Sequence, residues 1–156
     1  MNLSSGYHKL NGLLATLACW LQPVLLLVVR GWWGWSFFLT GKGKLMNLDK
    51  TTEFFASLNL PLPRLNAILA GSTECFGGLL LLFGLCSRLA SVPLIFTMFV
   101  AYATADKEAL HAIFSDPDKF TAATPFLFLF ACLIVFAFGP GKLSLDELVF
   151  RKGAAK

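Results

Sequence analysis

Charged residues are scarce in this chain of 156 residues: Asp, Glu, Lys and Arg make up 14% of it, whereas 56% of the residues are hydrophobic. Charged residues make up about a quarter of a typical soluble domain, so the composition excludes an ordinary water-soluble protein. The 13 basic residues are scattered and form no basic stripe, which removes the sequence signature of nucleic-acid binding. The partner that this composition predicts is a lipid bilayer.

Metal-binding and redox motifs are also missing. The two histidines and four cysteines form no C-x-x-C pair and no spacing typical of a zinc site. The sequence has no flavin, haem or iron–sulfur signature either. We therefore predict no metal site, and we interpret the cysteines as small packing residues: Cys19, Cys75, Cys86 and Cys132.

Four apolar runs have close to the 20 or so residues that a helix needs to cross a bilayer. The predicted spans cover about residues 23–40, 65–84, 89–105 and 122–139. Within the loop between the first two spans, residues 48–58 predict a short helix that lies on the membrane surface. The expected fold class is all-α, an integral membrane four-helix bundle with a short interfacial loop helix.

The four spans divide the chain into three predicted parts: an N-terminal amphipathic segment at 1–22, a membrane domain at 23–146 and a basic C-terminal tail at 147–156. Pro23 lacks the amide hydrogen of a continuous helix, so we expect it to kink or separate the first part from the first span. Residues 9–21 have the outline of a signal peptide. No small-x-small cleavage site follows them, so we expect the segment to be retained.

Basic residues do not decide the orientation, because six of them lie on each predicted side of the membrane. We expect both termini in the cytoplasm, because the tail is basic and the number of spans is even.

Two charged residues stand inside apolar spans, Arg30 in the first and Glu74 in the second. A charge in hydrocarbon costs about 3 kcal/mol or more, so it usually faces a partner or a functional site. If the two spans are antiparallel and begin at one membrane surface, both charges lie about 14 Å below it, at about 1.5 Å per residue. We therefore predict a buried ion pair, which either fixes helix pairing or belongs to a ligand site.

Glycines accompany both charges. They follow Arg30 at helical spacing on the same face, and a glycine pair shares the face of Glu74. Glycines let two helix backbones approach closely within a membrane. The sequence therefore predicts that the first span packs directly on the second through Gly34, Gly41, Gly77 and Gly78.

Aromatic residues near the two charges complete a candidate ligand site. An indole stacks on a flat ligand such as a quinone head, while a guanidinium binds the ligand's oxygen. Tyr102 and Asp106 stand at the end of the third span, where they would line a polar mouth. The alternative for any tryptophan is an interfacial anchor, and for Asp106 a solvated loop residue. The predicted ligand-binding residues are Arg30, Glu74, Trp33, Tyr102 and Asp106.

The order and spacing of four motifs in the chain resemble those of the DoxX family. The motifs are Arg30-x3-Gly34-x2-Phe37-x3-Gly41-x2-Lys44-Leu45 in the first span, Phe54 to Pro61 in the loop, Ala70 to Arg88 in the second span and turn, and Phe138 to Asp146 after the last span. The resemblance covers roughly Pro23 to Asp146 and implies a four-span, multi-pass protein of the bacterial inner membrane. The chain departs from one common family pattern, since Asp106 stands where relatives place a histidine.

The family takes its name from a subunit associated with thiosulfate:quinone oxidoreductase, and some members are linked to oxidative stress. The resemblance therefore implies a small redox subunit in which Arg30 holds a quinone or another lipophilic ligand, and Glu74 orients Arg30 or relays a proton. Any enzymatic activity would belong to a complex with a partner redox subunit. Two alternatives stay open: a non-enzymatic membrane scaffold or assembly factor, and a carrier for a small anion attracted to Arg30. The sequence leaves room for a homo-oligomer without deciding it.

Overall fold

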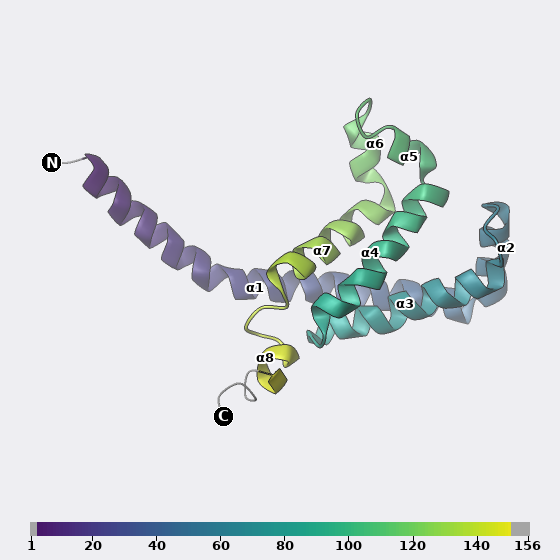
Figure 1. The fold of residues 1–156 in the computed structure, drawn as a ribbon, viewed down its shortest axis with the longest axis horizontal. Coiled ribbons are helices and arrows are strands. Elements are labelled where there is room, and N and C mark those ends of the chain that lie inside the picture. Colours follow the sequence, from purple (N-terminus) through teal and green to yellow (C-terminus); the bar gives the residue numbers. More distant parts are fainter. Residues whose placement is uncertain (1–2, 151–156) are drawn as a thin grey trace.

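The computed structural model describes residues 3–150, and every regular element within them is a helix (Figure 1). The prediction of an all-α fold is therefore confirmed. The helices in chain order are α1 (Leu3–Met46), α2 (Leu48–Ser57), α3 (Pro63–Phe83), α4 (Ser87–Thr104), α5 (Lys107–His111), α6 (Pro117–Ala122), α7 (Thr124–Phe138) and α8 (Leu145–Phe150).

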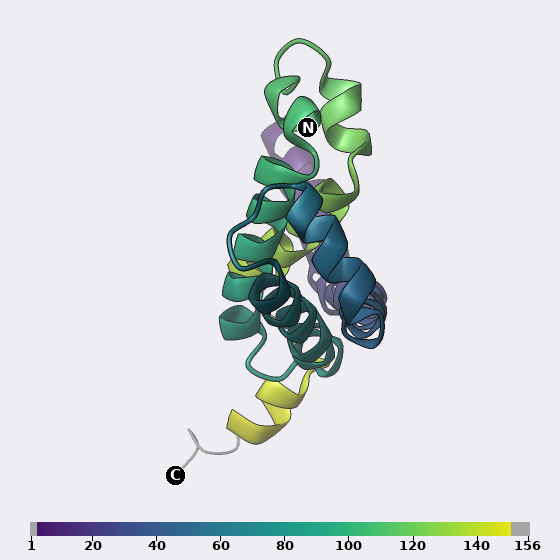
Figure 2. The same cartoon turned by 90° about the vertical axis from the view of Figure 1, so that its right-hand side faces the viewer.

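Three of these helices, α1, α3 and α4, are long and apolar enough to cross a membrane. The fourth predicted span corresponds to α7, an apolar helix of only 15 residues. The four helices form two pairs, α1 with α3 and α4 with α7. Further contacts of α3 with α4 and of α1 with α7 join the pairs, which cross one another (Figures 1 and 2).

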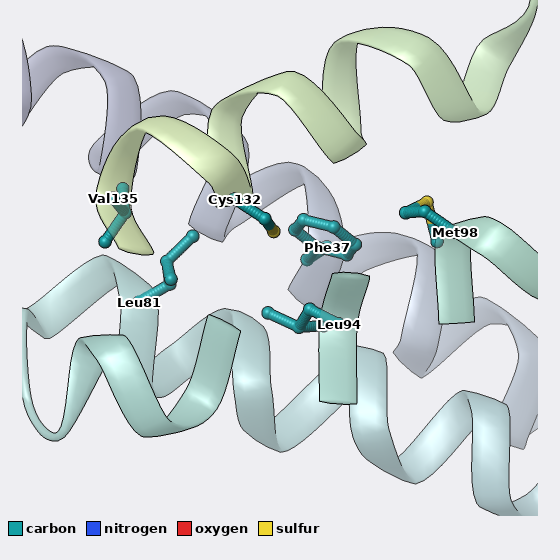
Figure 3. Close-up of a cluster of buried hydrophobic side chains, with 6 residues drawn as sticks. All are labelled: Phe37, Leu81, Leu94, Met98, Cys132 and Val135. Carbon is teal, nitrogen blue, oxygen red and sulfur yellow. The ribbon is translucent and has the colours of Figure 1, made fainter. Parts of the chain in front are cut away.

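The bundle core lies where all four helices meet (Figure 3). Each helix contributes apolar side chains that are removed from solvent and lipid, and their burial stabilises the crossing of the two pairs. The core residues are Phe37 from α1, Leu81 from α3, Leu94 and Met98 from α4, and Cys132 and Val135 from α7. The prediction that the cysteines are packing residues thus holds for Cys132, whereas Cys19 and Cys86 are exposed.

Helix α1 differs most from the prediction. It is one helix of 44 residues, about 66 Å long at 1.5 Å per residue, and Pro23 lies inside it. A proline removes one backbone hydrogen bond and bends a helix without having to end it. The N-terminal half leaves the bundle in a different direction from the paired half (Figure 1). At its other end α1 continues past the predicted boundary at Thr40 to Met46.

The segment from Asp106 to Thr121, between the third and fourth predicted spans, contains α5 and most of α6. Asp116 begins α6, because its carboxylate accepts a hydrogen bond of 3.2 Å from the backbone N–H of Lys119.

The terminal helix α8 begins with a side-chain cap. Ser144 Oγ accepts a hydrogen bond of 3.3 Å from the backbone N–H of Glu147. Of the predicted basic tail, residues 151–156 lie outside the described residues.

Candidate functional site

Helices α1 and α3 run antiparallel, and glycines determine their register. Gly41 lies so close to Gly71 that a Cβ atom on Gly41 would be 2.6 Å from the Gly71 carbonyl oxygen. Gly34 and Gly78 repeat this arrangement seven residues along each helix. Gly77, predicted to belong to the same contact, faces Leu94 of α4 instead, at 3.1 Å from its would-be Cβ.

This register does not bring Arg30 to Glu74. Among the described residues, Glu74 pairs with Lys44, and no ion pair joins Arg30 to any carboxylate. Arg30 lies beside Gly84, at the end of α3. Glu74 pairs with Lys44, which lies 14 residues farther along the chain, near the C-terminal end of α1. The predicted pairing assumed that both spans begin at one surface. Because α1 continues to Met46, Arg30 lies deeper along the bundle than that estimate placed it.

The partner of Glu74 is Lys44, whose Nζ lies 2.5 Å from Glu74 Oε1. The side chain of Glu74 is 1% exposed, and that of Lys44 is 32% exposed. A lysine can extend its apolar stem along a helix while its ammonium reaches a polar partner, which explains how a residue near the end of α1 neutralises a buried carboxylate.

The ion pair lies at the wall of a pocket of about 620 Å³ between α2, α3, α4 and the end of α1. The wall is mainly apolar, and side chains of the loop helix are part of it. The lining residues include Phe54, Phe55, Leu58 and Leu60 from α2 and the loop after it, Leu69, Ala70, Thr73 and Glu74 from α3, Phe96, Thr97, Val100, Ala101 and Thr104 from α4, and Lys44, Lys50 and Thr51.

The second carboxylate oxygen of Glu74 is without a partner in the part of the chain that the structure describes. Oε2 is buried and has no hydrogen-bond partner among the described residues. A buried polar atom without a partner costs about 1–3 kcal/mol, and more for a charged group. An apolar pocket of this volume with a polar group at its wall is typical of a site for a small amphipathic molecule.

Arg30 belongs to a separate cluster that joins the C-terminal segment to the turn between α3 and α4. Its guanidinium donates a hydrogen bond to the Leu143 carbonyl and lies against Gly84, where a side chain would overlap it. Gly84 also has a φ of 68°, which glycine adopts readily. The cluster therefore has an evident structural role, and Arg30 does not line the pocket.

Asp146 holds the other side of this cluster. Its carboxylate accepts hydrogen bonds from the backbone N–H groups of Cys86, at 2.7 Å, and Ser87, at 3.2 Å. These amides lie at the start of α4, where helix N–H groups have no intrahelical partner. Asp146 also interacts electrostatically with Arg30.

The remaining predicted ligand residues lie apart from the pocket as well. The Trp33 ring packs edge-on against Phe128 of α7, with centroids 5.0 Å apart. Tyr102 is buried on the other side of α4, and its hydroxyl donates a hydrogen bond of 2.8 Å to the Phe120 carbonyl. Asp106 stands before α5. Of the five residues predicted, only Glu74 lines the pocket.

Sequence reasoning missed Lys44 and Thr97 as site residues, although each had a recognisable signal. Lys44 follows Arg30 on the same helix face and lies one turn after Gly41. Thr97 and Thr104 are seven residues apart, so they share one face of α4. That periodic polar face within an apolar span indicates a lining rather than a lipid contact.

Comparison with known proteins relates the chain to a described family. The sequence model of the DoxX family matches residues 25–107, a range that contains every residue lining the pocket. The Bacillus subtilis (strain 168) protein named "Putative oxidoreductase CatD" is 30% identical over 125 residues, which cover 80% of this chain and 87% of that protein.

Two further relatives match the chain over a similar number of residues. The Escherichia coli (strain K12) inner membrane protein YphA is 31% identical over 127 residues, covering 81% of this chain and 91% of YphA. An uncharacterized protein of Haemophilus influenzae is 28% identical over 130 residues, covering 81% of this chain and 83% of that protein. No solved structure matches the chain significantly.

Proposed function

Because this chain belongs to the DoxX family of membrane proteins, we propose that it is a small subunit of a membrane redox system. It binds a quinone, or a lipophilic ring molecule like it, in the pocket between α2, α3 and α4. The observation that carries this proposal is the Lys44–Glu74 pair, with its buried carboxylate, at the wall of an apolar pocket of about 620 Å³. The relative CatD, provisionally named an oxidoreductase, supports a redox role.

The chemistry of the pocket suits such a ligand. Aromatic side chains, among them Phe55 and Phe96, offer faces on which a flat ring stacks. Lys44 offers a hydrogen-bond donor for an oxygen of its head, and Glu74 offers an acceptor for a hydroxyl where the head carries one. A redox role without a bound metal or flavin would rest on the quinone itself and on a partner subunit that exchanges electrons with it.

We place the protein in the bacterial inner membrane, with both termini in the cytoplasm. The name of YphA supports the membrane, and the basic tail and the four-helix bundle support the orientation. Reporter-enzyme fusions to the C-terminus, one active only in the cytoplasm and one active only outside it, test this orientation.

The two alternative functions have less support from the geometry. A carrier for small anions was suggested by Arg30, but its guanidinium is covered by Gly84 and the C-terminal segment and lies near the Asp146 carboxylate. A scaffold needs no pocket with a buried, lysine-paired carboxylate at its wall.

The proposal is tested by calorimetric titration of a short-chain quinone into the protein in lipid nanodiscs. Ala101→Phe fills the pocket, and Ala103→Phe is the matched control, because Ala103 is exposed on the same helix and does not line the pocket. We expect saturable binding by the wild type and by Ala103→Phe, and none by Ala101→Phe. Uptake that is unsaturable and equal in all three, and in empty nanodiscs, would mean partitioning into lipid and would refute the proposal.

A further inference from the structure

Three of the four threonines at the pocket wall donate their hydroxyl hydrogens to the backbone of the protein. Thr51, Thr97 and Thr104 each donate a hydrogen bond of 2.6–3.0 Å to the backbone carbonyl four residues earlier. A hydroxyl has one hydrogen and two lone pairs. The three threonines therefore offer a ligand only acceptors.

Glu74 adds the strongest acceptor. Its Oε1 is bound to Lys44, whereas its Oε2 is buried without a hydrogen-bond donor among the described residues. A carboxylate oxygen accepts hydrogen bonds and donates none. The described part of the protein therefore leaves Glu74 Oε2 without a hydrogen-bond donor, and a ligand could supply one.

The two lysine ammonium groups at the pocket wall are accessible to solvent. The Lys44 side chain is partly exposed and Lys50 is exposed, so their ammonium groups can bind water or lipid headgroups when the pocket is empty. Glu74 Oε2 has no such alternative, because it is buried. The two lysines therefore do not depend on a ligand for a hydrogen-bond partner, whereas Glu74 Oε2 does.

We propose that the pocket selects a ligand whose head carries an O–H or N–H donor, which it gives to Glu74 Oε2. For the ring molecules of the proposed function, on which this inference rests, the preferred form is the reduced hydroquinone or another phenol. The oxidised quinone has only carbonyl oxygens, which accept hydrogen bonds and donate none. It leaves Glu74 Oε2 without a partner in the bound state.

Three ligands of one shape test this preference in nanodiscs by calorimetry: a short-chain alkyl hydroquinone kept anaerobic, its dimethyl ether and the corresponding quinone. The ether keeps both oxygens and removes both donors. We expect the hydroquinone to bind about tenfold more tightly than either of the others, or more, since a hydrogen bond to a charged group is worth at least that factor.

Glu74 variants assign the preference to one side chain. In Glu74→Met the hydroquinone should lose its advantage while the affinity for the dimethyl ether stays at its wild-type value, which also shows that the variant is folded. Glu74→Gln keeps the shape and adds an amide donor, so it should shift the preference toward the quinone. This second variant tests the inference if Glu74→Met does not fold.

The outcomes separate this inference from the proposed function. If all three ligands bind equally to the wild type and Ala101→Phe abolishes binding of each, the pocket binds rings and the donor preference is wrong. A quinone that binds more tightly than the hydroquinone also overturns the preference. If none of the three binds saturably, the proposed function itself fails.

Discussion

Gly34 and Gly78 lie face to face between α1 and α3, so closely that a Cβ atom on either would come within 2.9 Å of the other's carbonyl oxygen. Both obstacles are backbone atoms, which cannot turn away as a side chain can. The distance between the two helices therefore depends on the absence of side chains at these positions. The same contact determines which residue of α1 lies opposite Glu74.

Gly78→Ala should destabilise the protein. The added methyl group forces α1 and α3 apart, and overpacking of this kind costs about 1–3 kcal/mol. Thermal and denaturant unfolding in detergent measure the loss. The control is Gly31→Ala on α1, where the added methyl group meets nothing within 4 Å. Alanine favours a helix over glycine by about 0.5–1 kcal/mol, so the control should be neutral or stabilising. Equal effects of the two substitutions would contradict the close approach.

Lys44→Met should destabilise the protein more than Glu74→Gln. The first substitution leaves the carboxylate of Glu74 buried and unpaired, and an uncompensated buried charge costs about 3–5 kcal/mol. The second leaves Lys44, which is partly exposed and can turn its ammonium toward water. Adding Glu74→Gln to Lys44→Met should therefore restore stability in a double-mutant cycle. Additive losses in the double variant would show that the two side chains do not interact.

Asp146→Ala should loosen the C-terminal segment and the start of α4. The substitution removes the acceptor of the Cys86 and Ser87 amides, and loss of such a cap costs about 0.5–2 kcal/mol. Hydrogen exchange at these two amides should accelerate while exchange in the middle of α3 stays slow. Asp118→Ala, at an exposed carboxylate in α6, is the control and should leave both unchanged. Unaltered protection of the α4 amides would argue against the cap.

The contact between α5 and α6 should depend on pH. Glu108 and Lys119 form an exposed pair of 2.9 Å, and the hydrogen bond and positive charge of Lys119 hold the pKa of Glu108 below its ordinary value of 4.5. A native pKa below the unfolded one means that the pair contributes stability above the ordinary pKa. It loses that contribution as the pH falls through the lowered native pKa.

An NMR titration of the Glu108 carboxyl carbon checks the direction. The midpoint should lie below 4.5 in the wild type and rise toward it in Lys119→Gln. Lys107→Gln removes the same charge from the neighbouring residue and should shift the midpoint less. A Glu108 midpoint that is the same in Lys119→Gln as in the wild type would mean that the pair does not form in solution.

Much of the fold could be predicted from the sequence because hydropathy and helix-ending residues are local signals. The boundaries of α2, α3, α4 and α7 lie close to those predicted, and the turn after Gly84 lies where the sequence indicates it. The extent of α1 could not be predicted in the same way. Pro23 is compatible with either a break or a bend, and contacts elsewhere in the chain decide between them.

The site was harder to predict because it depends on register. Two charges in two apolar spans suggest one ion pair, and the arithmetic of depth for Arg30 and Glu74 was consistent with it. A shift in the starting point of one helix changes which residues face each other, and the sequence does not show that starting point. Lys44 stands beyond the predicted end of its span at residue 40, so the depth estimate did not bring it to Glu74.

The short helix α7 has a consequence for the surrounding lipid. Its 15 residues rise about 22 Å, whereas the hydrocarbon layer of a bilayer is about 30 Å thick. Helices α1 and α3, which form the opposite pair, are both long enough to cross this layer. The two sides of the bundle therefore match bilayers of different thickness. Lipid beside α7 would thin locally to match it, and each unit of mismatch carries an elastic cost that a neighbouring short helix can share. Because of this asymmetry, membrane thickness should affect the stability of the protein mainly through α7, and thin bilayers should stabilise it.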